Sequence, residues 1–143
     1  MKLEDFEFPD DLGYMKGHIW VEIKEGEARL GVTSLGSSLA KEIVHVDLPE
    51  NNEEFNVLDP MASFETIKSV TEISAPFDCR VTGVNEKLLD DPSLINTDPY
   101  RNGWIIKLHI LKDNGDLMNV EEAVEYYGKI LGKEKERYKG IYD

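Results

Sequence analysis

The sequence predicts a mainly β protein, a small sandwich or barrel of short strands with a helix near its C-terminus. Short segments of alternating or β-branched residues recur between residues 18 and 110, and turn residues separate them every several positions. Apolar residues between 120 and 131 instead recur at helical spacing. A chain of 143 residues suits one domain with a modest core. We therefore expect a single β-rich unit with short helices and one C-terminal helix.

The first strands are expected after an irregular beginning. Residues 1–17 scatter aromatic residues among acids and glycines, which predicts an irregular lead-in that packs on the main domain. The strands begin at His18, where the segment IWVEI alternates in polarity. Gly26 then marks a turn, and a second strand is expected over residues 28–32.

A short helix and a third strand come next. Thr33 or Ser34 has the side chain of a helix cap and precedes a segment with apolar residues at helical spacing. The β-branched residues at 43–46 predict a strand, which ends before Pro49 because proline cannot donate to a sheet ladder.

A hairpin with a lysine at its tip is predicted from the next two strands, residues 61–67 and 70–74. The turn between them is Lys68-Ser69, whereas two-residue hairpin loops favour Asn-Gly or Asp-Gly. Turn chemistry alone therefore does not explain the lysine. A long amine on a rigid hairpin is well placed for covalent modification, although an exposed turn lysine is also an ordinary surface feature. The spacing alone leaves both interpretations open.

The remaining β elements follow a proline. Pro76 ends the hairpin, and extended structure is expected to resume over residues 80–84. Asn85 is predicted to cap a brief helix that ends before Pro92, because the residue before a proline avoids helical geometry. A final strand is expected over residues 104–110.

The C-terminal helix has a clear start. Asn119 and Glu122 form a capping box, which predicts a helix from about residue 120 to 131. The residues beyond it are mostly charged. The predicted organisation is a lead-in of residues 1–17, a main domain of residues 18–131 and a charged tail of residues 132–143.

Composition excludes several classes of function. The formal net charge is −13, with 29 acidic residues against 16 basic ones, which argues against nucleic-acid binding. Cys79 is the single cysteine, so no internal disulfide forms. There is no signal-peptide pattern and no apolar run of membrane-spanning length. We expect a cytoplasmic monomer without a membrane partner.

The three histidines do not predict a metal site. His45 and His109 alternate with apolar residues and are expected to be ordinary strand positions. The sequence has one cysteine and no His-Glu spacing typical of metal ligands. No glycine-rich phosphate loop is present either.

Several separate motifs resemble one known family. The hairpin FETIKSVTEISAP, residues 64–76, resembles the lipoylation hairpin of the glycine cleavage system H protein. HIW at residues 18–20 and GVTSLGSSLAKEIVHVDLPE at residues 31–50 resemble further family blocks. GVNEKLLDDPSLINTDPYRNGWIIKL, residues 83–108, is the closest match. The resemblance covers about residues 14–131, with the motifs in family order.

This resemblance implies a fold and a modified residue. The fold would be a flattened β-barrel of the lipoyl, or hammerhead, type. Lys68 would carry covalent lipoate, and Glu65, three residues earlier, would guide the lipoylating enzyme. The protein would be a carrier that catalyses no turnover alone. A cleft for the loaded arm would lie near residues 18–20 and the helix of residues 33–39.

The resemblance also implies partners. These would be the glycine decarboxylase (P protein), the aminomethyltransferase (T protein) and the dihydrolipoyl dehydrogenase (L protein) of glycine cleavage. A lipoate ligase or a lipoyl or octanoyl transferase would attach the arm.

Two residues depart from the family pattern. Ile19 replaces a usual glutamate, and Leu35 replaces a usual histidine or aromatic residue, so neither can pair with a charged aminomethyl amine. The segment FPDDL, residues 8–12, also resembles the lipoate-binding protein of heterodisulfide-reductase-like sulfur oxidation. The alternatives are therefore a lipoyl carrier in sulfur oxidation, or a scaffold that relays lipoyl or octanoyl groups. Biotin carriage is a weaker alternative, since biotin hairpins usually carry Met-Lys-Met.

Overall fold

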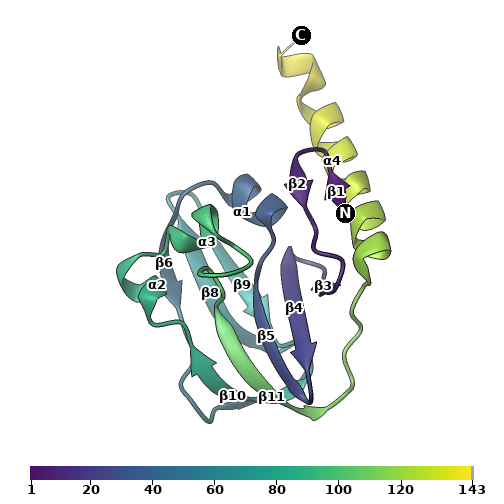
Figure 1. Cartoon of the computed structure of the whole chain (residues 1–143). Helices are drawn as coiled ribbons and strands as arrows, with labels where there is room; N and C mark the ends of the chain where they lie inside the picture. The colour runs from purple at the N-terminus through teal and green to yellow at the C-terminus, as the bar shows by residue number, and fades with distance from the viewer. Residues whose placement is uncertain (143) are drawn as a thin grey trace.

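Two antiparallel sheets form the body of the molecule (Figure 1). The structure is a computed structural model that describes the backbone of residues 1–142 and the side chains of residues 1–133. The larger sheet has the order β3-β4-β5-β11-β10-β7. Its strands are β3 (Gly13–Met15), β4 (Ile19–Lys24), β5 (Glu27–Val32), β7 (Glu54–Phe55), β10 (Asp78–Val84) and β11 (Ile106–Lys112).

The smaller sheet carries the lysine hairpin. Its order is β6-β8-β9, with β6 (Ile43–Asp47), β8 (Pro60–Thr66) and β9 (Val70–Ser74). A separate two-stranded sheet near the N-terminus pairs β1 (Lys2–Leu3) with β2 (Phe6–Glu7). The helices are α1 (Ser34–Ala40), α2 (Lys87–Asp90), α3 (Leu94–Thr97) and α4 (Val120–Tyr142).

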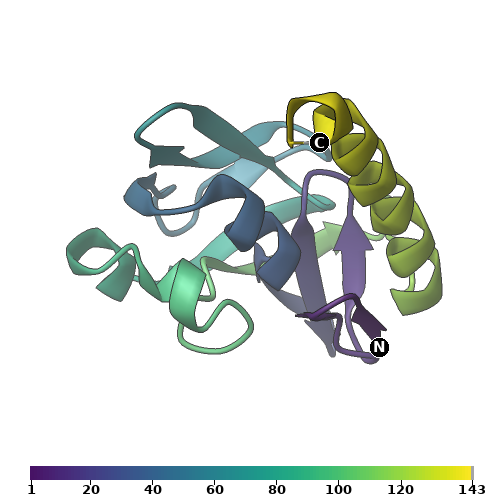
Figure 2. The ribbon, with the colours of Figure 1, turned by 90° about the horizontal axis from the view of Figure 1, so that it is seen from above.

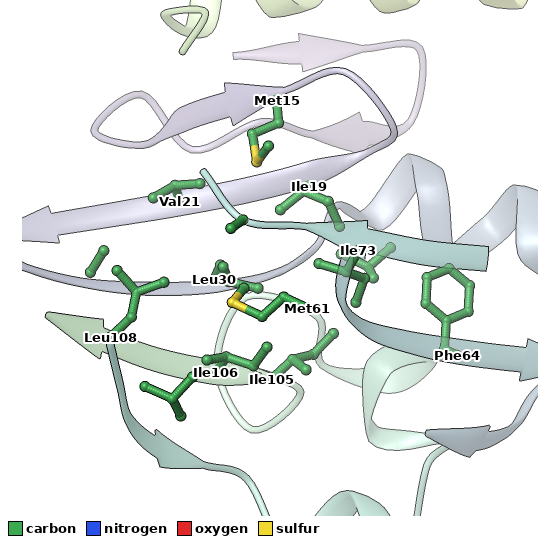
Figure 3. Close-up of a cluster of buried hydrophobic side chains, with 14 of the residues drawn as sticks. Met15, Ile19, Val21, Leu30, Met61, Phe64, Ile73, Ile105, Ile106 and Leu108 are labelled. Atoms are coloured by element: carbon green, nitrogen blue, oxygen red, sulfur yellow. The ribbon is translucent and has the colours of Figure 1, made fainter. Parts of the chain in front are cut away.

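The main core lies between the two sheets (Figure 3). Met61, Phe64 and Ile73 of the smaller sheet face strands of the larger one. The facing residues shown there include Val21, Leu30, Ile106 and Leu108. Burying such aliphatic and aromatic side chains contributes roughly 1.5–3 kcal/mol each. This packing gives the lysine hairpin a rigid base.

A second core lies on the opposite face of β4, where alternation sends Trp20 away from Ile19 and Val21. There α4 and the N-terminal segment cover the sheet. Its fully or largely buried members are Phe8, Leu12, Tyr14, Trp20, Leu35, Ala123 and Tyr127. The long final helix is therefore held by an aromatic cluster.

The predicted fold class, mainly β with short helices and a C-terminal helix, is confirmed. The sheets do not close into a barrel, however, and that part of the prediction needs correction. In the part of the chain that the structure describes, no strand of the larger, six-stranded sheet is hydrogen-bonded to a strand of the smaller, three-stranded sheet. Side-chain packing joins them, as in a sandwich.

The predicted turn at Gly26 and the predicted helix cap at Thr33 are both confirmed. Glu25 and Gly26 have φ of 51° and 80°, the left-handed pair of a tight hairpin between β4 and β5. Thr33 caps α1, because its hydroxyl accepts a hydrogen bond from the Gly36 amide at 3.0 Å.

The predicted cap at Asn85 was wrong. Glu86 precedes α2 without a side-chain cap bond. The Asn85 side-chain amide instead donates to the carbonyls of Asn102 and Trp104, at 2.7 and 2.8 Å. It is buried and holds the loop that leads into β11.

Both ends of the chain are more regular than expected. The capping box starts α4 as predicted: the Glu122 amide donates to Asn119 Oδ1 at 2.9 Å, and the Asn119 amide to Glu122 Oε1 at 3.2 Å. The helix then continues to Tyr142, beyond the expected end near residue 131. Asp143 and the side chains of residues 134–142 lie outside the described residues. The lead-in of residues 1–17 contains β1, β2 and β3.

None of the helices in the described part of the chain is both long and apolar enough to cross a membrane.

Candidate functional site

Lys68 lies in the connection between β8 and β9. The tip of this hairpin is on the side of the molecule away from α4 (Figure 2). Glu65 and Val70 are paired at the end of the ladder, and the Thr66 amide donates to the Ser69 carbonyl at 2.9 Å. The turn is therefore one residue longer than expected: Ile67 belongs to the turn and not to the strand, while β9 begins at Val70 as predicted.

The Thr66 hydroxyl explains why this turn needs no glycine. Its Oγ1 accepts hydrogen bonds from the amides of Lys68 and Ser69, both at 3.2 Å. A side-chain oxygen thus replaces a backbone acceptor in closing the turn. Among the described residues with positive φ, none lies between Thr66 and Val70. The sequence feature that specifies this turn is therefore Thr66, which general turn preferences do not include.

The lysine is exposed and lies between exposed apolar residues. Among the described side chains, none forms an ion pair or hydrogen bond with the Lys68 amine. Ile67 is 83% exposed and Val70 is 62% exposed. A fixed backbone with a free amine fits the requirement for a covalent attachment point, which must enter the active site of a modifying enzyme.

The outer face of the smaller sheet is acidic next to this tip. Glu65 and Glu72 alternate with inward-facing residues of β8 and β9, and Glu72 is opposite Ser63. On the other side of β8, His45 is opposite Glu65 and Asp47 is opposite Ser63. The predicted recognition residue Glu65 is therefore on the same hairpin as Lys68, and three carboxylates share one face.

His18 lies apart, under α4. Its φ of 68° is unusual for a residue other than glycine. Its ring stacks on Tyr127 at 4.8 Å between centroids, and its amide donates to the Tyr127 hydroxyl at 2.9 Å. That hydroxyl also donates to the Met15 carbonyl. The Nδ1 atom of His18 is buried without a hydrogen-bond partner among the described residues, and burial lowers the pKa of its imidazole.

The two positions that depart from the family pattern are both core positions. Ile19 is 3% exposed and packs between the sheets, whereas Leu35 is 0% exposed and packs in the second core. Neither side chain therefore faces solvent, where it would contact a bound group. The region that the resemblance pointed to for an arm cleft is occupied at these positions by packed apolar side chains.

His18→Asn is expected to flatten the pH dependence of stability. The folded state lowers the His18 pKa below its usual value of 6.5, so the unfolded state binds more protons. The stabilisation is present above about pH 6.5 and is lost as the pH falls toward the folded-state pKa, with a slope of at most about 1.4 kcal/mol per pH unit. Asparagine tolerates positive φ and does not titrate. Urea unfolding at pH values on both sides of that range measures the slope, and an equal slope in both proteins contradicts this role of His18.

Comparison with known proteins identifies the family. The family model described as glycine cleavage H-protein matches residues 12–130. The glycine cleavage system H protein 4 of Aquifex aeolicus is 39% identical over 136 residues, covering 94% of this chain and 80% of that protein. The glycine cleavage system H protein of Thermobifida fusca is 38% identical over 117 residues, covering 82% and 93%.

A solved structure has the same architecture. The crystal structure of a glycine cleavage system H protein from Mycobacterium marinum superposes with a TM-score of 0.79 at 30% identity, covering 85% of this chain and 99% of that one. The fold is thus that of a small, mostly β H-protein domain. The chain belongs to the glycine cleavage H-protein family.

Proposed function

We propose that this protein is the lipoylated H protein of a glycine cleavage system, with lipoate attached to the Nζ atom of Lys68. The observation that carries the proposal is the exposed, unpaired Lys68 amine at a hairpin tip, in a chain whose residues 12–130 match the glycine cleavage H-protein family. The protein is a carrier that catalyses no turnover by itself and acts as a monomer between its partner enzymes.

The residues around Lys68 suit such an attachment point. The Thr66 side chain fixes the turn, and the β6-β8-β9 sheet packs on the main core, so the tether has a stiff base. A bound lipoyl group would supply a dithiolane that takes an aminomethyl group from the decarboxylase to the aminomethyltransferase before the dehydrogenase reoxidises it.

Partner recognition is proposed to use the surface beside the tip. Ile67 and Val70 offer apolar contacts, while Glu65 and Glu72 offer negative charge on the same hairpin. Apolar contacts at the centre of a contact surface with charges around it suit brief, steered encounters. Glu65 would contribute to recognition by the lipoylating ligase or transferase.

The proposed cargo is the aminomethyl group. The relatives described above are all named for glycine cleavage, and this supports glycine over sulfur chemistry. Because Ile19 and Leu35 are buried, the charged amine would have to be held by other residues in this chain.

Glycine–bicarbonate exchange with the decarboxylase of the same organism tests the proposal. The lipoylated protein is expected to support exchange, and the unmodified protein is the matched control. If the fully lipoylated protein supports no exchange, yet is accepted by a heterodisulfide-reductase-like complex, carriage in glycine cleavage is refuted while carriage itself stands.

A further inference from the structure

Three potential metal ligands meet on the outer face of the smaller sheet. One ring nitrogen of His45 and one carboxylate oxygen each of Asp47 and Glu65 all lie within 4.8 Å of one another. They come from two strands, since His45 and Asp47 alternate on β6 and Glu65 is the β8 residue opposite His45. It is the one group of three such ligands among the described residues.

Backbone pairing sets this arrangement. The β6–β8 ladder has a register shift between Ile43 and His45, after which His45 and Asp47 are directed outward while Val46 is buried. A bulge of this kind redirects side chains. Because the register is anchored by the buried side chains on the inner face, the backbone positions from which the three outward side chains project are fixed.

The donor atoms already point at one another. His45 Nε2 is 3.1 Å from Asp47 Oδ1, and the Ser63 hydroxyl lies 3.5 Å from Asp47 Oδ2, where it can orient the carboxylate. His45 and Asp47 are both more than half exposed, which leaves room for water ligands. The chain's net charge of −13 also favours cations near its surface.

From this geometry we infer that His45, Asp47 and Glu65 bind a divalent transition-metal ion, with zinc as the best fit. An imidazole with two carboxylates is a borderline-to-hard donor set, and three protein ligands with water in the remaining position form an open zinc site. Magnesium and calcium prefer oxygen ligands throughout, so the imidazole selects against them.

The sequence predicted no metal site because it offers no local His-Glu spacing. The third ligand comes from a strand that is 18 or more residues away in the chain, and only the β6–β8 register brings it close. Metal binding would link β6 to the strand that leads to Lys68. It would also neutralise charge beside the tip. The inference itself holds whether or not Lys68 carries lipoate.

Titration calorimetry of the unmodified full-length chain with zinc chloride tests the site. We expect saturable binding of one zinc ion, weakened by at least about tenfold in both His45→Ala and Glu65→Gln, because removing a ligand costs at least as much as removing a supporting group. His109→Ala is the matched control: His109 also lies near a carboxylate, with Nδ1 2.9 Å from Glu27 Oε1, but lacks a third ligand among the described residues.

Thermal unfolding with and without zinc is the second measurement. Zinc should raise the thermal unfolding midpoint of the wild type and of His109→Ala, but not that of His45→Ala. Circular dichroism without metal checks that the variants fold. The inference is overturned if the wild type takes up no zinc, if His45→Ala binds zinc as tightly as the wild type, or if His109→Ala loses as much affinity as His45→Ala.

Discussion

Lys68→Arg should leave the fold intact and abolish carrier function. The side chain at this position is exposed and has no ion-pair or hydrogen-bond partner among the described residues, so its replacement disturbs no packing. Surface changes of this kind usually alter stability by less than about 0.5 kcal/mol. Arginine keeps the positive charge, but its guanidinium stays protonated and is no substitute for an amine nucleophile in amide formation. The loss should therefore be complete.

The measurement is glycine–bicarbonate exchange after treatment with a lipoate ligase, together with the urea unfolding curve. Lys24→Arg is the matched control, since Lys24 is also an exposed lysine at the end of a hairpin strand. We expect wild-type exchange in Lys24→Arg and none in Lys68→Arg. Exchange retained by Lys68→Arg would place the arm elsewhere.

Trp20→Ala should produce the largest loss of stability. Trp20 is 0% exposed, its indole N–H donates to the Pro99 carbonyl at 3.0 Å, and its ring lies against Tyr100 at 6.0 Å between centroids. A Cβ atom added at Gly31 of β5 would come within 2.8 Å of the Trp20 ring, so the indole packs directly against the backbone of this glycine. Removing such a side chain costs about 3–5 kcal/mol.

Equilibrium unfolding in urea gives this free-energy difference. The change Trp104→Ala is a useful comparison, because Trp104 is only partly buried and packs at the edge of the same cluster. Its loss should be clearly smaller. A Trp20→Ala protein with wild-type stability would mean that α4 and the N-terminal segment are not held by the second core.

The parts of the fold that depend on local patterns were predictable. Alternation along the strands, the capping box at Asn119 and Glu122, and the hairpin around Lys68 all depend on residues close together in sequence. Such patterns act through neighbours at fixed spacing and can be recognised without a structure.

The parts that depend on distant contacts were not predictable from local patterns. Asn85 has the side chain of a helix cap, yet its amide is used by carbonyls 17 and 19 residues away. The Glu65 carboxylate meets His45 only through strand pairing. Tertiary contacts decide between the roles that a polar side chain can take, and the sequence leaves those roles open.

The roles of Ile19 and Leu35 also depend on distant contacts. From the sequence, both positions differ from the family pattern because an apolar residue replaces a polar or aromatic one. The structure adds that both side chains are core residues, one in each hydrophobic cluster. In this chain both positions therefore contribute to core packing, and neither is available to bind a charged cargo.

Peptide-level mass spectrometry of the protein after reaction with lipoate and a lipoate ligase is the most direct test of the attachment point. A single lipoyl amide is expected on the Lys68 side chain, with every other lysine unmodified. A lipoyl group found on a different lysine, or an unmodified protein under conditions that lipoylate an established H protein, would contradict the account.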